Sequence, residues 1–209
     1  MKIVIKVMFN IITVITFLMF ANDVFADANE VIASIKADTK LNKKTAVMVI
    51  DMQTHYEYAF VEQEKVIEEQ LKVIKYAAKN NLPIVDVNID DFSPTLDRLL
   101  LKMQRSTMYE LFNKTQESAF GIENGEEALN TYLRSKGVQK IYMMGCFDTS
   151  CVLKTVEDAL NLDYEVVVDR GLNIHAPNEK NFKWRDLKIF NSDKLTVLEE
   201  NRSSSCNIL

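Results

Sequence analysis

Short, continuously apolar runs alternate with amphipathic segments along this chain of 209 residues. The run at Thr45–Asp51 reads TAVMVID, a helical pattern covers Glu62–Asn80, and a second apolar run covers Pro83–Ile89. Uninterrupted apolarity, in contrast to strict alternation, is typical of strands that are buried on both faces of a parallel sheet. The feature therefore predicts an α/β fold with a mostly parallel, Rossmann-like central sheet.

The same alternation continues through the second half of the chain. It predicts helices over Pro94–Met103, Glu123–Lys136 and Ser150–Leu162, and strands over Tyr109–Phe112, Lys140–Gly145, Tyr164–Asp169 and Leu195–Leu198. Strands that alternate with helices are joined by right-handed crossovers, which place helices on both faces of the sheet. We therefore expect one three-layer α/β/α sandwich over residues 44–200.

The first 26 residues have the layout of a secretory signal peptide. Lys2 and Lys6 give a basic start, Val7–Phe20 is almost wholly apolar, and Val24-Phe25-Ala26 provides a cleavage site after Ala26. The alternative is an uncleaved membrane anchor, although the apolar stretch is shorter than the ~20 residues that a spanning helix needs. We expect a secreted or periplasmic protein that has no membrane attachment after cleavage.

Both ends of the mature chain are predicted to lie outside the domain. Residues 27–43 are polar with a helical tendency and are expected to form a surface lead-in, and residues 201–209 a flexible tail. The final Cys206-Asn207-Ile208-Leu209 fits a prenylation pattern only loosely, so an incidental cysteine is the favoured interpretation.

Composition excludes several functions. The net charge of −5 argues against a broad nucleic-acid-binding surface. Two His and three Cys cannot build an array of zinc fingers. An odd number of cysteines leaves at least one thiol unpaired within the chain, and we expect Cys151 to be that free thiol.

Candidate catalytic residues follow the predicted strands, because sites in parallel sheets lie at the carboxyl ends of the strands. Cys151 begins a predicted helix, where unsatisfied N–H groups and the helix dipole favour a thiolate and can hold an oxyanion. Asp51 ends a strand and could accept the thiol proton, and Lys114 precedes a loop and could stabilise both anions. Taken singly, a structural cysteine, a strand-end acid and a solvated lysine are the favoured interpretations.

Three motifs occur in a fixed order: VMVIDMQ at 47–53, KTQESAFG at 114–121 and GCFDTSCV at 145–152. Together they resemble the isochorismatase-like cysteine hydrolase family, over roughly residues 44–170. The resemblance implies an Asp51–Lys114–Cys151 triad, in which the thiol attacks an amide or related carbon and forms a thioester-like intermediate. It also implies a small-molecule substrate, common assembly into oligomers, and a cis peptide bond between Cys146 and Phe147 beside the oxyanion.

The chain departs from the family pattern at several positions. Cys146, Phe147 and Asp148 occupy a turn in which the family usually has small residues and a Thr, and we expect the charge of Asp148 to oppose thiolate formation. Thr54-His55-Tyr56 replaces an Asn-Asp-Phe-like segment. The candidate substrate-pocket residues are His55, Tyr56 and Phe120.

A metal site of the nicotinamidase type is not expected, and we predict no cofactor. The region VDVNIDDFSPTLDRLL has no His, and we expect its acids Asp86, Asp90 and Asp91 to be solvated. Two further hypotheses remain beside the amide hydrolase. One is a true isochorismatase, in which Asp51 protonates a vinyl ether; the other is a non-catalytic binding module, which Phe147 and Asp148 would favour.

Overall fold

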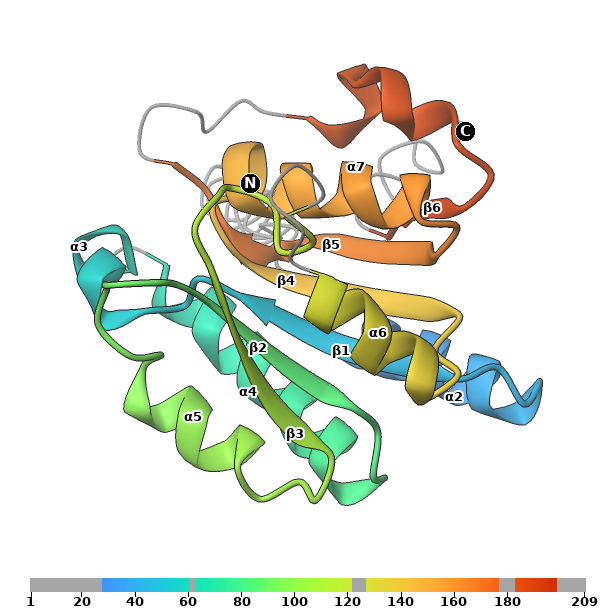
Figure 1. The fold of residues 1–209 in the computed structure, drawn as a ribbon, viewed down its shortest axis with the longest axis horizontal. Helices are drawn as coiled ribbons and strands as arrows, with labels where there is room; N and C mark the ends of the chain where they lie inside the picture. Colours follow the sequence, from blue (N-terminus) through green and yellow to red (C-terminus); the bar gives the residue numbers. More distant parts are fainter. Residues whose placement is uncertain (1–27, 61–62, 122–126, 177–182, 199–209) are drawn as a thin grey trace, which may run out of the picture.

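Six parallel strands form the centre of the computed structural model, which describes residues 28–60, 63–121, 127–176 and 183–198 (Figure 1). The strands are β1 (Thr45–Ile50), β2 (Ile84–Ile89), β3 (Tyr109–Lys114), β4 (Lys140–Cys146), β5 (Glu165–Ile174) and β6 (Leu195–Val197). Their order across the sheet is β3-β2-β1-β4-β5-β6. The predicted three-layer α/β/α fold is confirmed.

Helices cover both faces of this sheet (Figure 1). One face packs against α2 (Ala28–Lys40), α4 (Glu64–Lys79) and α5 (Asp97–Met103), and the other against α6 (Glu127–Ser135) and α7 (Leu153–Asn161). The short α3 (Glu57–Phe60) follows β1. The apolar runs of the sequence supply the buried strands: all six residues of β1 are buried. Two apolar cores result, one on each face of the sheet.

The segment before β1 is more than a surface lead-in. Residues 28–40 form the helix α2, and Val31 and Ile35 on its inner side are buried against the sheet. The side chain of Asp38 is also buried, and it bonds to Lys140 and Tyr142 of β4. This helix is therefore part of the hydrophobic core.

β5 and the segment after β4 are among the elements whose bounds differ from the sequence prediction. β5 continues to Ile174, five residues beyond the predicted end, and its register with β4 shifts between Met143 and Gly145. The turn after β4 is a single π-helical turn, Asp148–Val152, and α7 begins only at Leu153. Cys151 thus lies in this turn rather than at the first residue of the α-helix.

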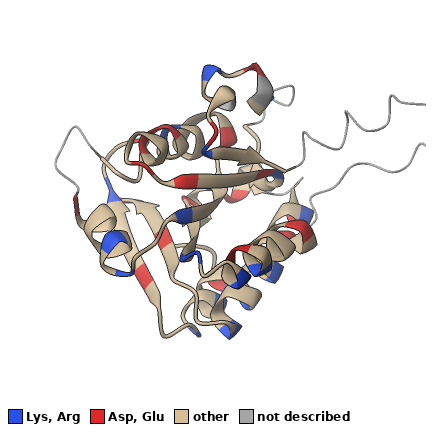
Figure 2. Ribbon diagram, turned by 90° about the vertical axis from the view of Figure 1, so that its right-hand side faces the viewer, with Lys and Arg blue, Asp and Glu red and all other residues tan. Residues whose placement is uncertain are grey.

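Charged residues of both signs are interspersed along the helices in the view of Figure 2. Within the described residues, no helix is both long and apolar enough to span a bilayer. The predicted signal peptide and the predicted tail at 201–209 lie outside the described residues.

Candidate active site

Asp51 and Lys114 form a buried ion pair at the carboxyl edge of the sheet. Asp51 directly follows β1, and Lys114 is the last residue of β3. The Lys114 Nζ lies 2.9 Å from Asp51 Oδ2, and the two side chains are 1% and 0% exposed. The Lys114 ammonium also donates a hydrogen bond of 2.6 Å to the carbonyl oxygen of Glu117. The sequence alone also allowed Lys114 to be a solvated surface residue. In the structure it is buried and pairs with the carboxylate of Asp51.

Backbone constraints hold Asp51 in place. Its φ is 52°, a left-handed conformation that few residues other than Gly adopt, and its N–H donates to the carbonyl of Val87 on β2 at 2.8 Å. On the other side, β1 approaches β4 closely at Gly145. A Cβ at Gly145 would lie 2.2 Å from the carbonyl oxygen of Ile50, so only glycine fits there. The strand end that carries Asp51 is thus fixed from both neighbouring strands.

Cys151 joins the ion pair from the turn after β4. Its side chain is 8% exposed, and Asp51 and Lys114 both lie close enough to change the pKa of its thiol. The carbonyl of Cys151 accepts a 2.7 Å hydrogen bond from Thr155 Oγ1, which in turn accepts one of 3.0 Å from the N–H of Ala119. Thr155 therefore connects the turn to the Ser-Ala-Phe segment, a role that no sequence motif had indicated.

Burial controls the resting protonation of the thiol. Burial, followed by the negative charge of Asp51, raises the pKa of Cys151 to about 12, although Lys114 opposes the shift. Burial likewise raises the pKa of Asp51, and Lys114 partly offsets this effect. Lys114 thus favours the thiolate as expected, but burial and the charge of Asp51 outweigh it, so the net effect favours the protonated thiol.

The turn before Cys151 contains the expected cis peptide bond between Cys146 and Phe147. The Phe147 carbonyl accepts hydrogen bonds from the N–H groups of Ser150 (3.2 Å) and Val152 (3.1 Å), which closes the turn. Its ring packs edge-on against Tyr56, with the centroids 5.5 Å apart. Cys146 and Cys151 are both free thiols.

Asp148 lies in the same turn as Cys151 and has a partner of its own. Its carboxylate is fully buried, and Oδ2 lies 2.5 Å from His175 Nδ1. Its charge contributes to raising the pKa of Cys146, after the larger effects of burial and of the Asp51 and Cys151 charges. The pairing of Asp148 with His175 links residues 27 positions apart, and no sequence motif had indicated it.

The three candidate pocket residues lie in different environments. Tyr56 is half-buried, and burial together with the nearby charges of Asp51 and Cys151 raises its pKa. His55 is exposed and stacks on Phe92 at a centroid distance of 4.3 Å. Phe120 is only 2% exposed and stacks on Tyr164, so it packs in the core and offers little surface to a ligand.

Asp86 was expected to be solvated, and the structure shows that this was wrong. It is fully buried on β2, where it accepts hydrogen bonds from Thr95 Oγ1 (2.9 Å) and Tyr109 Oη (3.1 Å). Burial raises its pKa to about 6. Asp90 and Asp91 follow β2 in a turn, at partly or fully exposed positions. In the described parts of the chain, no group of three or more His, Cys, Asp or Glu is placed to hold a metal ion.

Comparison with known proteins identifies the family. The model of the isochorismatase domain matches residues 45–172, which is more than half of the chain and includes Asp51, Lys114 and Cys151. The chain belongs to the isochorismatase family. The protein is therefore a hydrolase of the isochorismatase-like, cysteine hydrolase type, as the three ordered motifs indicated.

Solved structures of isochorismatase-family enzymes share the fold. N-carbamoylsarcosine amidase from Thermoplasma acidophilum is 24% identical, with a TM-score of 0.57 over 74% of this chain and 95% of that chain. The nicotinamidase from Staphylococcus aureus is 19% identical, with a TM-score of 0.60 over 74% and 99%. The nicotinamidase/pyrazinamidase from Bacillus subtilis is 20% identical, with a TM-score of 0.60 over 74% and 98%. Comparison with curated protein sequences gave no match.

Proposed function

We propose that this isochorismatase-family protein hydrolyses a small amide or related C–N bond through a thioester-like intermediate on Cys151. The observation that carries the proposal is the buried Asp51–Lys114 ion pair beside the Cys151 thiol. A thiol with a pKa of about 12 is ionised in only about one molecule in 10⁵ at pH 7, so it needs a base to become a nucleophile. Asp51 is the carboxylate in position to be that base.

The first half of the reaction uses all three residues. The thiol gives its proton to Asp51 as Sγ attacks the substrate carbon, and the Lys114 ammonium stabilises the negative charge that develops between them. Backbone N–H groups of the turn before Cys151 stabilise the oxyanion. The proton on Asp51 then passes to the departing nitrogen, and water releases the acid from the thioester.

Substitution of the triad tests the proposal. Cys151→Ala should abolish the turnover of every small amide that the wild-type protein cleaves, by at least about a thousandfold, while the fold survives. Asp51→Asn and Lys114→Ala should each reduce turnover strongly. The measurement is product formation in a panel of small amides, with circular dichroism as the control for folding. Amide turnover that Cys151→Ala leaves unchanged would contradict the proposal.

One observation favours a second candidate, hydrolysis of a vinyl ether such as isochorismate. Burial raises the pKa of Asp51, which favours the protonated carboxyl group that the protonation of an enol ether carbon requires. In that reaction Cys151 need not act as a nucleophile. Isochorismate turnover that survives Cys151→Ala but is lost in Asp51→Asn would favour this candidate over the amidase.

A non-catalytic binding module is the remaining alternative. The two residues that favoured this alternative both have partners in the structure: Phe147 packs against Tyr56, and Asp148 is paired with His175. Labelling of the folded, reduced protein with a thiol-directed activity probe separates the two cases. Labelling of wild-type protein that requires Asp51 supports the hydrolase, whereas an inert Cys151 supports the binding module.

Export is part of the proposed function. The leader at residues 1–26 supports a secreted or periplasmic enzyme that acts as a soluble protein after cleavage near Ala26. Mass spectrometry of the mature protein from an exporting host should find a new N-terminus at Asp27. A protein that retains Met1 and stays in the membrane fraction would show that the leader is an anchor.

A further inference from the structure

A second carboxylate is buried beside the nucleophile, and the triad does not use it. Asp148 opens the single turn that contains Cys151, and its side chain is fully buried. A buried carboxylate is costly unless a partner compensates for the lost hydration. The partner here is His175, whose Nδ1 lies 2.5 Å from Asp148 Oδ2.

His175 is held at the edge of the turn by its backbone as well as its ring. It directly follows β5, and the pairing of Cys146 with Ile174 places it next to Phe147. Its N–H donates to Gln63 Oε1 at 2.9 Å, and Gln63 Nε2 donates to its carbonyl at 3.0 Å. These contacts fix the position of the residue, and the bond to Asp148 then fixes the orientation of the ring.

The arrangement leaves one ring nitrogen for chemistry. When Nδ1–H donates to Asp148, Nε2 carries the free lone pair of a neutral imidazole. None of the described residues forms a hydrogen bond with Nε2. The His175 side chain is 23% exposed, whereas Asp51 and Lys114 are 0% and 1% exposed. The His175 side chain is therefore accessible to water.

We propose that His175 is a second acid–base group of the active site and activates the water that hydrolyses the thioester. This inference rests on the proposed cysteine mechanism. The water oxygen bonds to the thioester carbon and one water proton moves to Nε2. The C–S bond breaks with its electron pair on Cys151 Sγ, and the proton on Nε2 then passes to Sγ. The products are the carboxylic acid and the free thiol.

Asp148 is a positioning residue in this scheme. It touches neither substrate nor water, and it acts by holding the Nδ1–H tautomer and by stabilising the imidazolium that forms during the proton transfer. Asp148→Asn should therefore affect the same step as His175→Gln, in the same direction.

p-Nitrophenyl acetate separates the two halves of the reaction, because nitrophenolate is released when the thiol is acetylated and further release requires hydrolysis of the thioester. The wild-type protein should give a burst that Cys151→Ser abolishes, followed by steady turnover. His175→Gln keeps an amide that can donate to Asp148. This variant should retain the burst within about threefold and lose about a hundredfold in the steady phase. Mass spectrometry should then show acetyl-Cys151 accumulating.

Three controls make the result decisive. Added imidazole should restore part of the steady phase in His175→Ala, which a purely structural role of the ring would not allow. Asp193→Asn removes an exposed acid elsewhere on the surface and should match the wild type. Denaturant unfolding of each variant reports any loss of fold.

The outcomes distinguish this inference from the proposed function. An unchanged steady phase in His175→Gln, or burst and steady phases that fall together without imidazole rescue, would overturn the role of His175 and leave the cysteine mechanism standing. A wild-type protein without a Cys151-dependent burst would overturn the cysteine mechanism itself, and this inference with it.

Discussion

At the scale of single residues, the site depends on polar groups that are removed from water. Asp51 and Lys114 would each be costly to bury alone, and their 2.9 Å contact compensates for part of that cost. The same burial raises the pKa of the Cys151 thiol, because a buried thiolate loses much of the hydration that would stabilise it. Reactivity therefore depends on proton transfer within the site rather than on a thiolate that exists at rest.

The buried Asp86 predicts a pH dependence of stability. Its pKa is about 6 in the folded protein and 3.8 in the unfolded chain, so the folded state binds more protons between these values. Asp86 therefore contributes most to the free energy of unfolding below pH 4. This contribution decreases as the pH rises through 6, by about 3 kcal/mol in total. Protonated Asp86 can donate to Thr95 Oγ1, which then donates to Asn88 Oδ1 at 3.0 Å.

Asp86→Asn tests this dependence. Urea unfolding at pH 4.5 and at pH 7.5 should show the variant gaining on the wild type as the pH rises, by about 2 kcal/mol. Parallel pH profiles for the two proteins would show that Asp86 does not titrate in this range.

The close approach of β1 and β4 leaves no room for a side chain at Gly145. In Gly145→Ala, the new Cβ would lie 2.2 Å from the Ile50 carbonyl oxygen and 2.8 Å from the Ile50 nitrogen, so β1 must move and carry Asp51 with it. We expect a loss of about 3 kcal/mol or more in the free energy of unfolding, together with a loss of activity. Both are measured on the purified variant.

Gly137→Ala is the matched control. Gly137 has a φ of +69°, but the nearest atom to its Cβ would be Lys44 Cγ at 4.0 Å. This change should lower the free energy of unfolding by only ~1 kcal/mol, the cost of an alanine in the left-handed backbone conformation. Activity should stay intact. Equal effects of the two substitutions would mean that the contact with Ile50 is not limiting.

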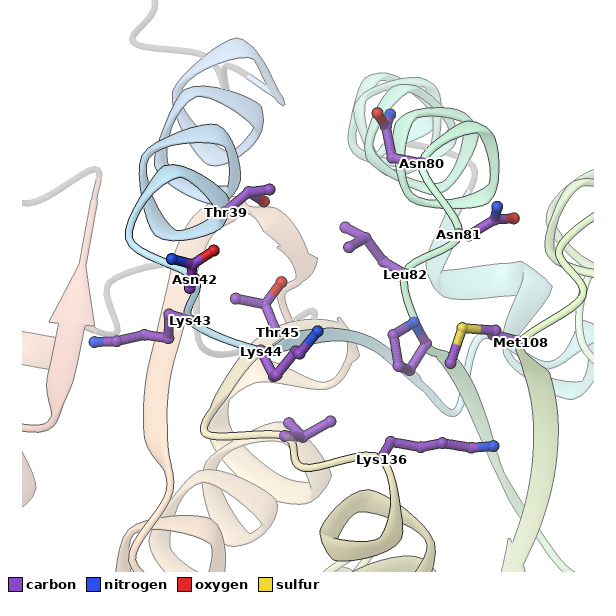
Figure 3. Close-up of a pocket in the computed structure, with 12 residues that line it drawn as sticks. Thr39, Asn42, Lys43, Lys44, Thr45, Asn80, Asn81, Leu82, Met108 and Lys136 are labelled. Atoms are coloured by element: carbon purple, nitrogen blue, oxygen red, sulfur yellow. The ribbon is translucent and has the colours of Figure 1, made fainter.

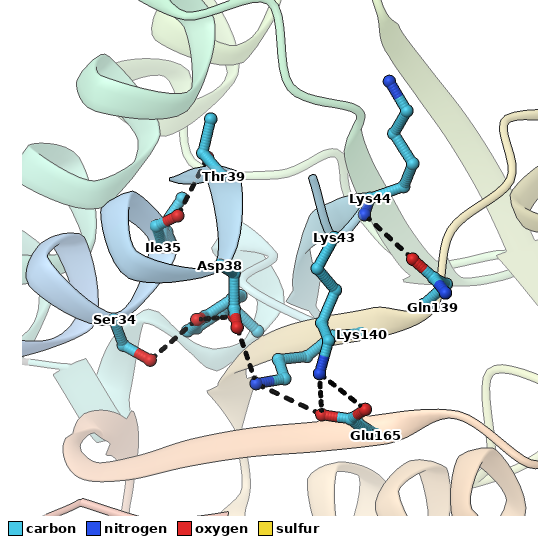
Figure 4. Close-up of polar contacts among 10 residues, drawn as sticks. Ser34, Ile35, Asp38, Thr39, Lys43, Lys44, Gln139, Lys140 and Glu165 are labelled. Carbon is cyan, nitrogen blue, oxygen red and sulfur yellow. Dashed lines mark hydrogen bonds and ion pairs between the residues drawn. The ribbon is translucent and has the colours of Figure 1, made fainter. Parts of the chain in front are cut away.

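At the scale of elements, α2 is bound to the sheet by both apolar and polar contacts. Figure 4 shows Asp38 reaching Lys140, which together with Lys43 also binds Glu165 of β5. The hydroxyl of Tyr142 donates to Asp38 Oδ2 at 2.6 Å beneath this network. Asp38 of α2 is thus linked to β4 directly and to β5 through Lys140. The turn with Cys151 follows β4, and His175 follows β5.

Ile35→Ala tests whether α2 is part of the cooperative core. Ile35 is fully buried, and the loss of its side chain should lower the free energy of unfolding by about 2–5 kcal/mol. Lys36→Ala removes the next, exposed side chain and should change it by less than about 0.5 kcal/mol. Guanidinium unfolding curves give both values, and similar small effects would mean that α2 is a peripheral lead-in.

The sequence predicted those elements whose apolar pattern is strong. The runs that became β1 and β4 lie within one residue of their predicted ends, because full burial leaves a continuous apolar run. The buried face of α2 has only a few small or branched residues among polar ones, so its packing was missed. The burial of Asp86 and the pairing of Asp148 with His175 were also missed. Both depend on contacts between residues that are distant in the sequence, and a local sequence pattern does not contain such contacts.

At the scale of the whole molecule, the two edges of the parallel sheet differ. The catalytic groups lie at the carboxyl edge, whereas a cavity of about 340 Å³ lies at the amino edge (Figure 3). Lys44, four residues after the end of α2, and Lys136, directly after α6, line this cavity. A cation next to the C-terminal end of a helix complements the negative end of the helix dipole.

The double variant Lys44→Met/Lys136→Met tests this separation of edges. Strands of about six residues place the two edges roughly 20 Å apart, so KM and kcat for the substrate should stay at wild-type values. Loss of the two dipole contacts should lower the free energy of unfolding by no more than about 2 kcal/mol. A large rise in KM would mean that the amino-edge cavity takes part in substrate binding.

The strand order also governs when the chain first becomes reactive during synthesis. Among the strands, β1 is made first, β2 and β3 follow and lie on one side of it, and β4 then pairs with its other side. A chain that ends before residue 140 contains Asp51 and Lys114 but no cysteine. The half-sheet of β1, β2 and β3 is therefore inert on its own, and a competent nucleophile exists only in molecules whose second half has been made and paired.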